Sequence, residues 1–206
     1  MATGRTPDEL RLDGGHLALD FVNTVGGLRD EGPDPEDEAL ETYEDLIAWS
    51  RRLGLVRTDE LARETPPRGR ERAVAQARDL RALIYAIFRA HADGRPPEAR
   101  DLARLRDAER EALAHAELLP NGDAMKWSWP ASGDPASPLW PIAHAAVELL
   151  TRGPLGRIKT CGNCRWLFLD HSRNGSRRWC SMEECGTEVK ARRFVEQRRR
   201  RRAATA

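Results

Sequence analysis

The most regular apolar pattern in the chain follows the helix-breaking stretch Thr65-Pro-Pro-Arg-Gly69. Apolar residues there recur every three or four positions, which places them on one face of a helix. The pattern ends near Gly94, and its members are Leu80, Leu83, Ile84, Ile87, Phe88 and His91. The spacing therefore predicts a long amphipathic helix in the middle of the chain.

Four further segments are predicted to be helical. Thr42 and Asp45 form a capping-box pattern that opens a helix ending at Gly54, with Tyr43, Leu46, Ile47 and Leu53 as its apolar positions. Thr58 begins a second, short helix. Pro97 begins another that stops at Pro120-Asn-Gly122, with Leu102, Leu105, Ala112, Leu113, Ala116 and Leu119 on its apolar face. The last starts near Ser137, with Ile142, Ala143, Ala146, Val147 and Leu150 as its buried stripe.

Strand signals are few in the first three quarters of the chain. Residues 10–24 alternate in polarity after Gly14-Gly15, which predicts a strand or the start of a hairpin. Residues 26–37 are acidic and rich in Gly and Pro, as in a loop, and Met125 to Trp129 resembles a short strand. The first unit is therefore predicted to be mostly helical.

In the last quarter the pattern changes. Arg165 to Asp170 is strand-like, Arg177 to Cys180 is its expected partner, and Asn174-Gly175 between them favours a hairpin turn. A helix is expected from Cys185-Gly186 to about Arg202. Ala191, Phe194 and Val195 would pack on the hairpin, whereas Lys190, Arg193 and Arg200 share another face.

The four cysteines of the chain all lie in this quarter, as Cys161-x2-Cys164-x15-Cys180-x4-Cys185. Two close pairs separated by a hairpin-length insert can supply the four thiolates that a tetrahedral zinc ion requires. A site closed by four cysteines leaves no position for water, so the zinc would be structural. The order of knuckle, hairpin and helix is treble-clef-like.

Other interpretations of these residues are weaker. Disulfides require an oxidising compartment, and the segment MATGRTPDEL has no features of a secretory signal. A redox pair at Cys161 and Cys164 would leave the other two cysteines without a role. His171 could replace one ligand, but a polar histidine beside a turn is more often solvated. His16, Asp20, Asn23, His91 and His144 show no catalytic spacing and are expected to be structural.

Charge is distributed unevenly along the chain. Residues 157–206 hold 14 Lys and Arg against 5 Asp and Glu, a net charge of +9, whereas residues 1–156 have a net charge of −8. Arginine outnumbers lysine 31 to 3, so composition bias accounts for the residue type but not for its accumulation at one end. An acidic body with a basic appendage is typical of a nucleic-acid-binding protein.

These features predict a fold that is mostly α with a small β-hairpin element. We expect a helical N-terminal domain at residues 1–153 and a zinc finger with a basic C-terminal helix at residues 157–206, with the boundary in residues 151–156. The second unit is too small for an apolar core alone, which is why a metal is expected there. No run is apolar and long enough for a membrane span, and a cytoplasmic location is expected.

The chain resembles the CGNR zinc finger proteins, a bacterial family named for stress-induced transcription regulation. The resemblance rests on residues 166–170, 172–182 and 190–194 in the finger, and on Gly15-His-Leu-Ala-Leu-Asp-Phe-Val-Asn-Thr24 in the first unit. One departure is clear, because the family signature Cys-Gly-Asn-Arg is Cys185-Gly186-Thr187-Glu188 here. Glu188 would either reverse a contact with nucleic acid or favour the helix N-terminus.

We therefore predict a zinc-dependent DNA-binding transcriptional regulator that is not an enzyme. The N-terminal domain would sense a small-molecule ligand or mediate self-association. Phosphate contacts are expected from arginines and one lysine of the finger, namely Arg173, Arg177, Arg178, Lys190, Arg192, Arg193 and Arg200. The alternatives left open are a zinc-stabilised adaptor whose basic helix binds an acidic partner, an RNA-binding protein and an enzyme within the helical domain.

Overall fold

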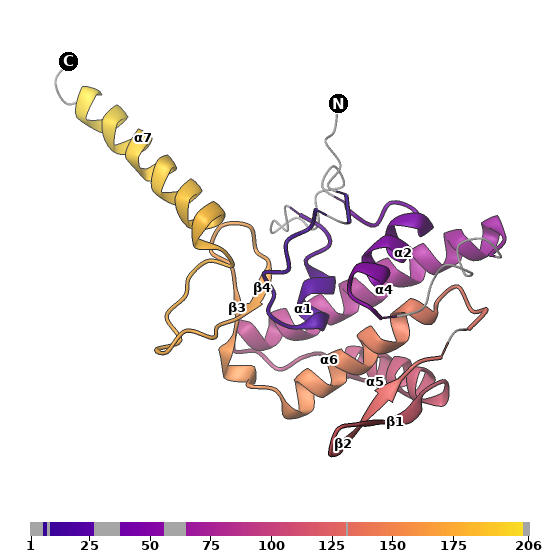
Figure 1. Cartoon of the computed structure of the whole chain (residues 1–206). Coiled ribbons are helices and arrows are strands. Elements are labelled where there is room, and N and C mark those ends of the chain that lie inside the picture. Colours follow the sequence, from indigo (N-terminus) through magenta and orange to yellow (C-terminus); the bar gives the residue numbers. More distant parts are fainter. Residues whose placement is uncertain (1–5, 8, 27–37, 56–64, 131, 204–206) are drawn as a thin grey trace.

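The computed structural model describes residues 6–7, 9–26, 38–55, 65–130 and 132–203. A helical body is followed by a small strand-containing segment and by a helix that points away from the body (Figure 1). The predicted fold class, mostly α with small β elements, is confirmed. The helices of the body are α1 (Leu17–Val22), α2 (Tyr43–Arg52), α4 (Pro67–Ala92), α5 (Ala99–Ala114) and α6 (Trp140–Arg152).

The two helices with the clearest sequence signals are confirmed. At the start of α2, Thr42 Oγ1 accepts the Asp45 N–H at 3.2 Å and Asp45 Oδ2 accepts the Thr42 N–H at 2.8 Å, which is the predicted capping box. The longer α4 buries Leu80, Leu83 and the other predicted apolar positions except His91, which is half-buried. The α4 axis is about 39 Å long at 1.5 Å per residue.

The predicted strand or hairpin at residues 10–24 is wrong, because Leu17–Val22 forms α1. Ala18, Leu19, Phe21 and Val22 are all fully buried, so this short helix is surrounded by other elements on nearly every side. A segment buried on all sides has no solvent-facing stripe, and the 3.6-residue period is then absent from its sequence. The His16 side chain caps the helix by accepting the Ala18 N–H.

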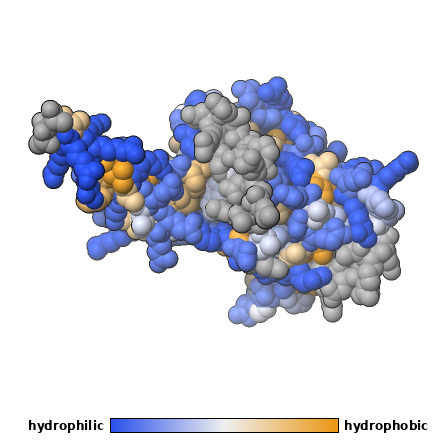
Figure 2. All heavy atoms as spheres, turned by 90° about the horizontal axis from the view of Figure 1, so that it is seen from above, coloured by the Kyte–Doolittle hydropathy of each residue, from blue (hydrophilic) through white to orange (hydrophobic). Residues whose placement is uncertain are grey.

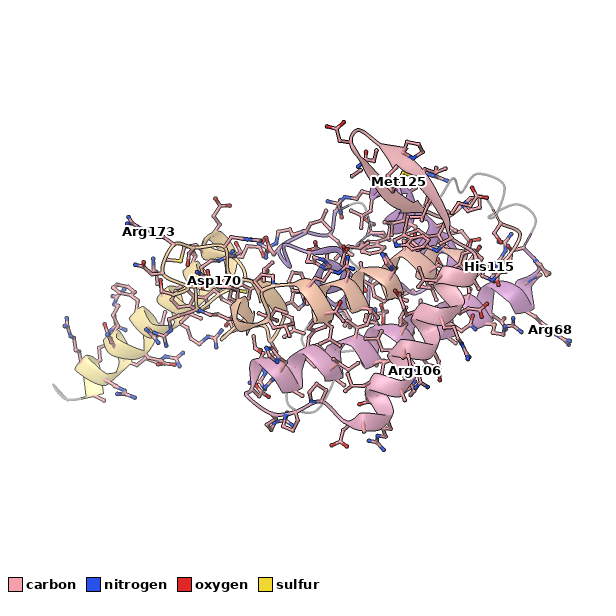
Figure 3. All side chains as sticks on the ribbon, turned by 90° about the horizontal axis from the view of Figure 1, so that it is seen from below. Arg68, Arg106, His115, Met125, Asp170 and Arg173 are labelled. Atoms are coloured by element: carbon pink, nitrogen blue, oxygen red, sulfur yellow. The ribbon has the colours of Figure 1, made fainter. Side chains whose placement is uncertain are left out.

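The helix that was expected to reach Pro120 ends at Ala114 instead. Residues Glu117–Asn121 form β1, which pairs antiparallel with β2 (Ala124–Ser128) through a turn in which Gly122 has a φ of 62°. Leu119 is exposed on this hairpin, so it extended the predicted apolar pattern without belonging to the buried face of α5. The strand expected near Met125 is confirmed, and Figure 3 shows the hairpin that carries Met125 standing out from the body.

The helix predicted to start near Ser137 begins as the 3-10 turn η2 (Ser137–Leu139) and continues as α6. Ile142, Ala143 and Ala146 are buried as expected, whereas Val147 and Leu150 are half-buried at the margin of the core. The loop expected at residues 26–37 and the helix expected at Thr58 lie outside the described residues, except for Gly26.

One hydrophobic core joins the helical body to the segment that follows it. The 3-10 turn η3 (Leu155–Arg157) leads from α6 into β3 (Ile158–Thr160), which pairs antiparallel with β4 (Leu167–Leu169). Ile158, Leu167 and Leu169 belong to the same buried cluster as α1, α2, α4 and α6. The strands of the last quarter are therefore part of the packing of the body.

A buried ion pair fixes the segment after α1 to α4. The Arg81 guanidinium binds both carboxylate oxygens of Glu38 and donates to Thr24 Oγ1 at 3.0 Å. The side chains of Arg81 and Glu38 are only 7% and 13% exposed. Since each charge is desolvated, removing either partner would leave the other buried and unpaired.

Candidate metal centre and basic arm

The cysteine pair at Cys161 and Cys164 lies in the connection between β3 and β4. The Cys161 N–H donates to the Trp166 carbonyl at 2.7 Å, and the Arg165 N–H donates back to the Cys161 carbonyl at 3.2 Å. Arg165 closes this turn in the left-handed region, with a φ of 66°. The knuckle is thus the turn of a small hairpin, and the strand after it pairs with residues that precede the first cysteine.

The predicted pairing of residues 165–170 with 177–180 is therefore wrong. Leu167 pairs with Thr160 and Leu169 pairs with Ile158. A turn does form before Gly175, whose N–H donates to the Ser172 carbonyl at 3.1 Å, but it lies in an irregular loop. Residues 177–180 are attached to the knuckle by the Gly162 N–H, which donates to the Arg178 carbonyl at 3.0 Å.

The second cysteine pair is brought to the knuckle by a single π-helical turn, η4 (Met182–Gly186), that precedes the final helix α7 (Thr187–Ala203). The Ser181 side chain caps this turn by accepting the Glu184 N–H. Gly186 leaves room for the turn to close, because an added Cβ would lie 2.6 Å from the Met182 sulfur. The helix predicted from Cys185-Gly186 to Arg202 is confirmed within a few residues.

The four cysteine sulfur atoms converge within 4.8 Å of one another. The Cys164 and Cys180 sulfurs are 3.6 Å apart, and those of Cys180 and Cys185 are 3.7 Å apart. A tetrahedron with Zn–S bonds of about 2.3 Å has an edge of about 3.8 Å, so this spacing fits one zinc ion. All four cysteines are free, and three of them are buried.

The electrostatics of the cluster also fit a cation. Hydrogen bonds from Cys164 and Cys180 hold the pKa of the Cys161 thiol far below its usual range. The neighbouring Cys161 and Cys164 sulfurs, together with burial, raise the pKa of Cys180. One thiolate thus opposes the formation of the next, and a bound Zn²⁺ would supply the positive charge that four adjacent thiolates need.

His171 lies outside this group of sulfurs. It packs over Gly15, where an added Cβ would approach His171 Nε2 to 3.2 Å and where φ is 72°. The interpretation of His171 as a non-ligand therefore agrees with the structure of the described residues.

A buried carboxylate, Asp170, organises the loop between the two cysteine pairs. Its oxygens accept from the Lys159 ammonium at 2.8 Å, from the Ser172 N–H and hydroxyl at 2.9 Å and 2.6 Å, and from the Arg177 N–H at 2.9 Å. Burial alone would raise the pKa of Asp170, but Lys159 and the other donors hold it well below its ordinary value. The ionised carboxylate therefore anchors the loop to β3 and β4.

Residues of the body form hydrogen bonds with the edge of β4 that faces away from β3. The Asn23 amide accepts the Leu167 N–H at 3.1 Å and donates to the Leu167 carbonyl at 2.9 Å, as a paired strand would. The Leu169 N–H donates to the Gly14 carbonyl at 2.8 Å, and Trp166 Nε1 donates to the Val25 carbonyl at 2.8 Å. Residues 14–25 thus serve as the outer edge of the hairpin that carries the knuckle.

The final helix, which we call the basic arm (residues 187–203), contacts little else. None of its residues is buried, and Figure 1 shows it pointing away from the body. The expected packing of Ala191, Phe194 and Val195 on the hairpin is wrong, because Phe194 is 60% exposed and Val195 is 48% exposed. Figure 2 shows apolar surface on this arm among hydrophilic residues. Because the arm points away from the hairpin, these side chains do not reach it (Figure 1).

Glu188, the departure from the family signature, links the arm to the knuckle. Its carboxylate accepts from the Asn163 amide at 2.8 Å and from the Arg192 guanidinium at 2.8 Å, and Arg192 also donates to Asn163 Oδ1 at 2.9 Å. The three side chains form a closed, solvent-exposed triangle. Glu188 thus neutralises Arg192 one turn further along the helix.

The structure divides the cationic residues proposed for nucleic acid into two groups. Arg177 is half-buried, lies 4.9 Å from the Phe168 ring and donates to the Cys180 carbonyl, and Arg192 is held in the triangle. Both therefore have structural roles. The others are exposed to solvent, and Figure 3 shows Arg173 pointing outward from the finger. The exposed group is Arg173, Arg178, Lys190, Arg193 and Arg200.

Two of the residues expected to be structural, Asp20 and Asn23, form hydrogen bonds with the backbone. Asp20 accepts the Gly14 N–H at 2.8 Å, which is a local backbone bond, whereas the bonds of Asn23 reach a strand 144 residues away. Sequence reasoning missed Asn23, Lys159 and Asp170 as the supports of the finger. The one available signal concerned Lys159 and Asp170, since Lys159 lies two residues before Cys161 and Asp170 ends the strand-like segment that follows Cys164.

Two family models match the chain. A model described as "Putative stress-induced transcription regulator" (ABATE) matches residues 15–153, and a model of the CGNR zinc finger matches residues 157–201. Neither description names an enzyme. No curated protein matches the chain. Within the described residues, every helix is too short or too polar to cross a lipid bilayer.

Proposed function

Since the chain belongs to the ABATE family of stress-induced transcription regulators and carries a CGNR zinc finger, we propose that it is a zinc-dependent DNA-binding regulator. In this proposal, Cys161, Cys164, Cys180 and Cys185 hold one structural zinc ion. The helical body, residues 1–153, and the finger, residues 157–206, act as two functional units although they share a core. The protein works in the cytoplasm and has no enzymatic activity.

The observation that carries the proposal is the basic arm. It has eight cationic residues against two acidic ones, and five of the cations, residues 198–202, are consecutive. A helix of this length extends about 25 Å at 1.5 Å per residue, so it can follow a groove of duplex DNA across several phosphates. Zinc orders the knuckle and the π-helical turn from which the arm starts, and this fixes the direction of the arm.

The exposed cations would contact phosphate and thereby position the protein without reading sequence. Arg173 and Arg178 lie on the loop between the cysteine pairs, and Lys190, Arg193 and Arg200 lie on the arm. Arg177 and Arg192 support these contacts through the fold of the finger, because their guanidinium groups already have protein partners.

The test is a fluorescence-anisotropy titration of the zinc-loaded chain against random-sequence duplex DNA at several salt concentrations. Affinity should fall steeply with salt, by roughly 0.9 log units per log unit of salt for each phosphate contacted. Arg173→Gln should weaken binding and reduce this slope by about 0.9. Arg68→Gln is the matched control, because Arg68 is exposed at the end of the molecule opposite the arm (Figure 3). Equal effects of the two variants would contradict the proposal.

A second candidate is an adaptor whose basic arm binds an acidic protein. The exposed apolar side chains of Phe194 and Val195 favour it, since such residues gain more from a protein surface than from phosphate. Weak, salt-insensitive binding to duplex DNA, with Phe194→Ala leaving that binding unchanged, would support the adaptor. In the leading proposal the helical body either senses a ligand or mediates self-association.

A further inference from the structure

A cavity of about 580 Å³ opens on the helical body between α5, α6 and the β1–β2 hairpin. Its walls come from α5, from the exposed strand β2 and its continuation, and from α6 between His144 and Arg152. The residues on which the inference depends are Glu109, Trp127, Trp129, His144, Lys126 and Arg152. Its volume is in the range that holds small organic ligands.

A histidine–carboxylate pair lies at the inner wall of this cavity. Glu109 Oε1 is 2.9 Å from His144 Nδ1, and the two side chains are only 15% and 20% exposed. The second oxygen, Glu109 Oε2, is buried and has no hydrogen-bond partner among the described residues. An unpaired buried carboxylate oxygen is costly, so a positive charge close to Glu109 would stabilise the site.

The same helix offers a comparison. Glu111 pairs with His115 at 3.1 Å, but the Glu111 side chain is 65% exposed and the pair lies outside the cavity. Water can satisfy Glu111 from all sides. The two Glu–His pairs of α5 therefore differ in burial, and of the two only that of Glu109 lines the cavity.

Aromatic rings form the wall next to the pair. The His144 ring lies 6.1 Å from the Trp127 ring, edge to face, and 5.5 Å from the Trp129 ring. Trp127 is 40% exposed, which is unusual for the largest apolar side chain. Indole faces beside a buried anion attract a cation that has an apolar body.

The charges of the rim do not reverse this preference. Lys126 and Arg152 also line the cavity, but both are solvent-exposed, whereas Glu109 is enclosed. Exposed charges are screened by water and salt, and enclosed charges are screened much less. For an organic anion in the cavity, the strongest electrostatic interaction would therefore be repulsion by Glu109.

We propose that this cavity binds a small aromatic ammonium compound, with its ammonium group beside the Glu109 carboxylate and its ring against Trp127. This inference deepens the sensing role proposed for the body, and it is independent of DNA binding because its test contains no DNA. The last turn of α6, with Thr151 and Arg152, lines the cavity and leads through η3 directly into β3 of the finger. An occupant therefore lies beside the segment that joins body and finger.

The experiment is isothermal titration of the zinc-loaded full chain with 1-naphthylmethylamine, a cation at neutral pH, and with 1-naphthoate, an anion of similar size. The amine should bind, and the anion should not bind up to about 1 mM. Glu109→Gln keeps the shape and the bond to His144 but removes the charge, and it should weaken amine binding about tenfold or more. Trp127→Ala should weaken it about fivefold.

Glu111→Gln is the matched control and should leave amine affinity within about twofold of the original protein, since Glu111 does not face the cavity. Thermal unfolding of each variant shows whether the body is intact, and Trp127 is exposed enough for its removal to be tolerated. The proposal is overturned if neither probe binds, if both bind equally, or if the amine binds Glu109→Gln and Trp127→Ala as tightly as it binds Glu111→Gln.

Discussion

Replacing Asn23 with alanine should loosen the finger from the body at one defined point. The substitution removes two hydrogen bonds and leaves the N–H and carbonyl of Leu167 without their partner, in a residue that is fully buried. Each unsatisfied buried backbone group costs about 1–3 kcal/mol, so the expected loss is at least about 2 kcal/mol. For a chain of this length, that lowers the unfolding midpoint by at least about 4 °C.

Asn23→Asp tests the same geometry more sharply. The aspartate still offers an oxygen to the Leu167 N–H, but it places a second oxygen against the Leu167 carbonyl where Asn23 has an N–H donor. A buried carboxylate oxygen that faces a carbonyl oxygen is more costly than a missing bond. Asn23→Asp should therefore destabilise the chain at least as much as Asn23→Ala.

Two assays separate local from global effects. Thermal unfolding followed by tryptophan fluorescence reports the stability of the whole chain, and the rate of zinc transfer to a coloured chelator reports opening of the knuckle. Both should change in Asn23→Ala, because Leu167 lies three residues after Cys164 on the strand that Asn23 pairs with. Asn174→Ala, at an exposed position of the finger, is the control. Unchanged stability within about 0.5 kcal/mol, with unchanged zinc release, would refute the role of Asn23 as a strand partner.

Three further predictions follow from other parts of the structure. Elemental analysis should find one zinc per chain in the original protein and none in Cys180→Ser, and the substitution should also lower the unfolding midpoint of the body, because β3 and β4 belong to its core. Glu188→Arg releases Arg192 from its ion pair and adds a second cation. The slope of log affinity for DNA against log salt concentration should therefore steepen by about 0.9–1.8. Glu196→Arg, the control, should change this slope less. Burial raises the pKa of Asp20 to about 6, so the folded protein binds a proton at Asp20 more tightly than the unfolded chain does. The free energy of unfolding, measured relative to Asp20→Asn, should therefore be highest below about pH 4. It should fall by up to about 3 kcal/mol as the pH rises through about 6.

The features that the sequence predicted are those encoded locally. The capping box at Thr42 and Asp45 uses residues three positions apart, and the periodicity of α4 lies within one helix. The cysteine spacing is equally local, because two short pairs need only a turn each to form the cluster. In each case the chemistry acts between neighbours along the chain, and its pattern is complete before any tertiary contact forms.

The features that escaped prediction depend on distant partners. A six-residue helix buried on all sides resembles an alternating strand when its surroundings are unknown, as at Leu17–Val22. The choice of Ile158–Thr160 as the partner of β4, in place of residues 177–180, follows from the docking of that hairpin into the body. Phe194 was expected to be buried because it is apolar, but the angle at which the arm leaves η4 exposes it.

The pairing of Asn23 with Leu167 has a consequence for the order in which the protein can be made. The two residues are 144 positions apart, and ribosomes add about 5–20 residues per second. Roughly 7–30 s therefore pass between the synthesis of Asn23 and the synthesis of its partner Leu167. During that interval the apolar side of α1 has no cover from Leu167 and Leu169. The core of the body becomes complete only when Leu167 and Leu169 have left the ribosome, so the nascent body depends on these later strands for protection from aggregation.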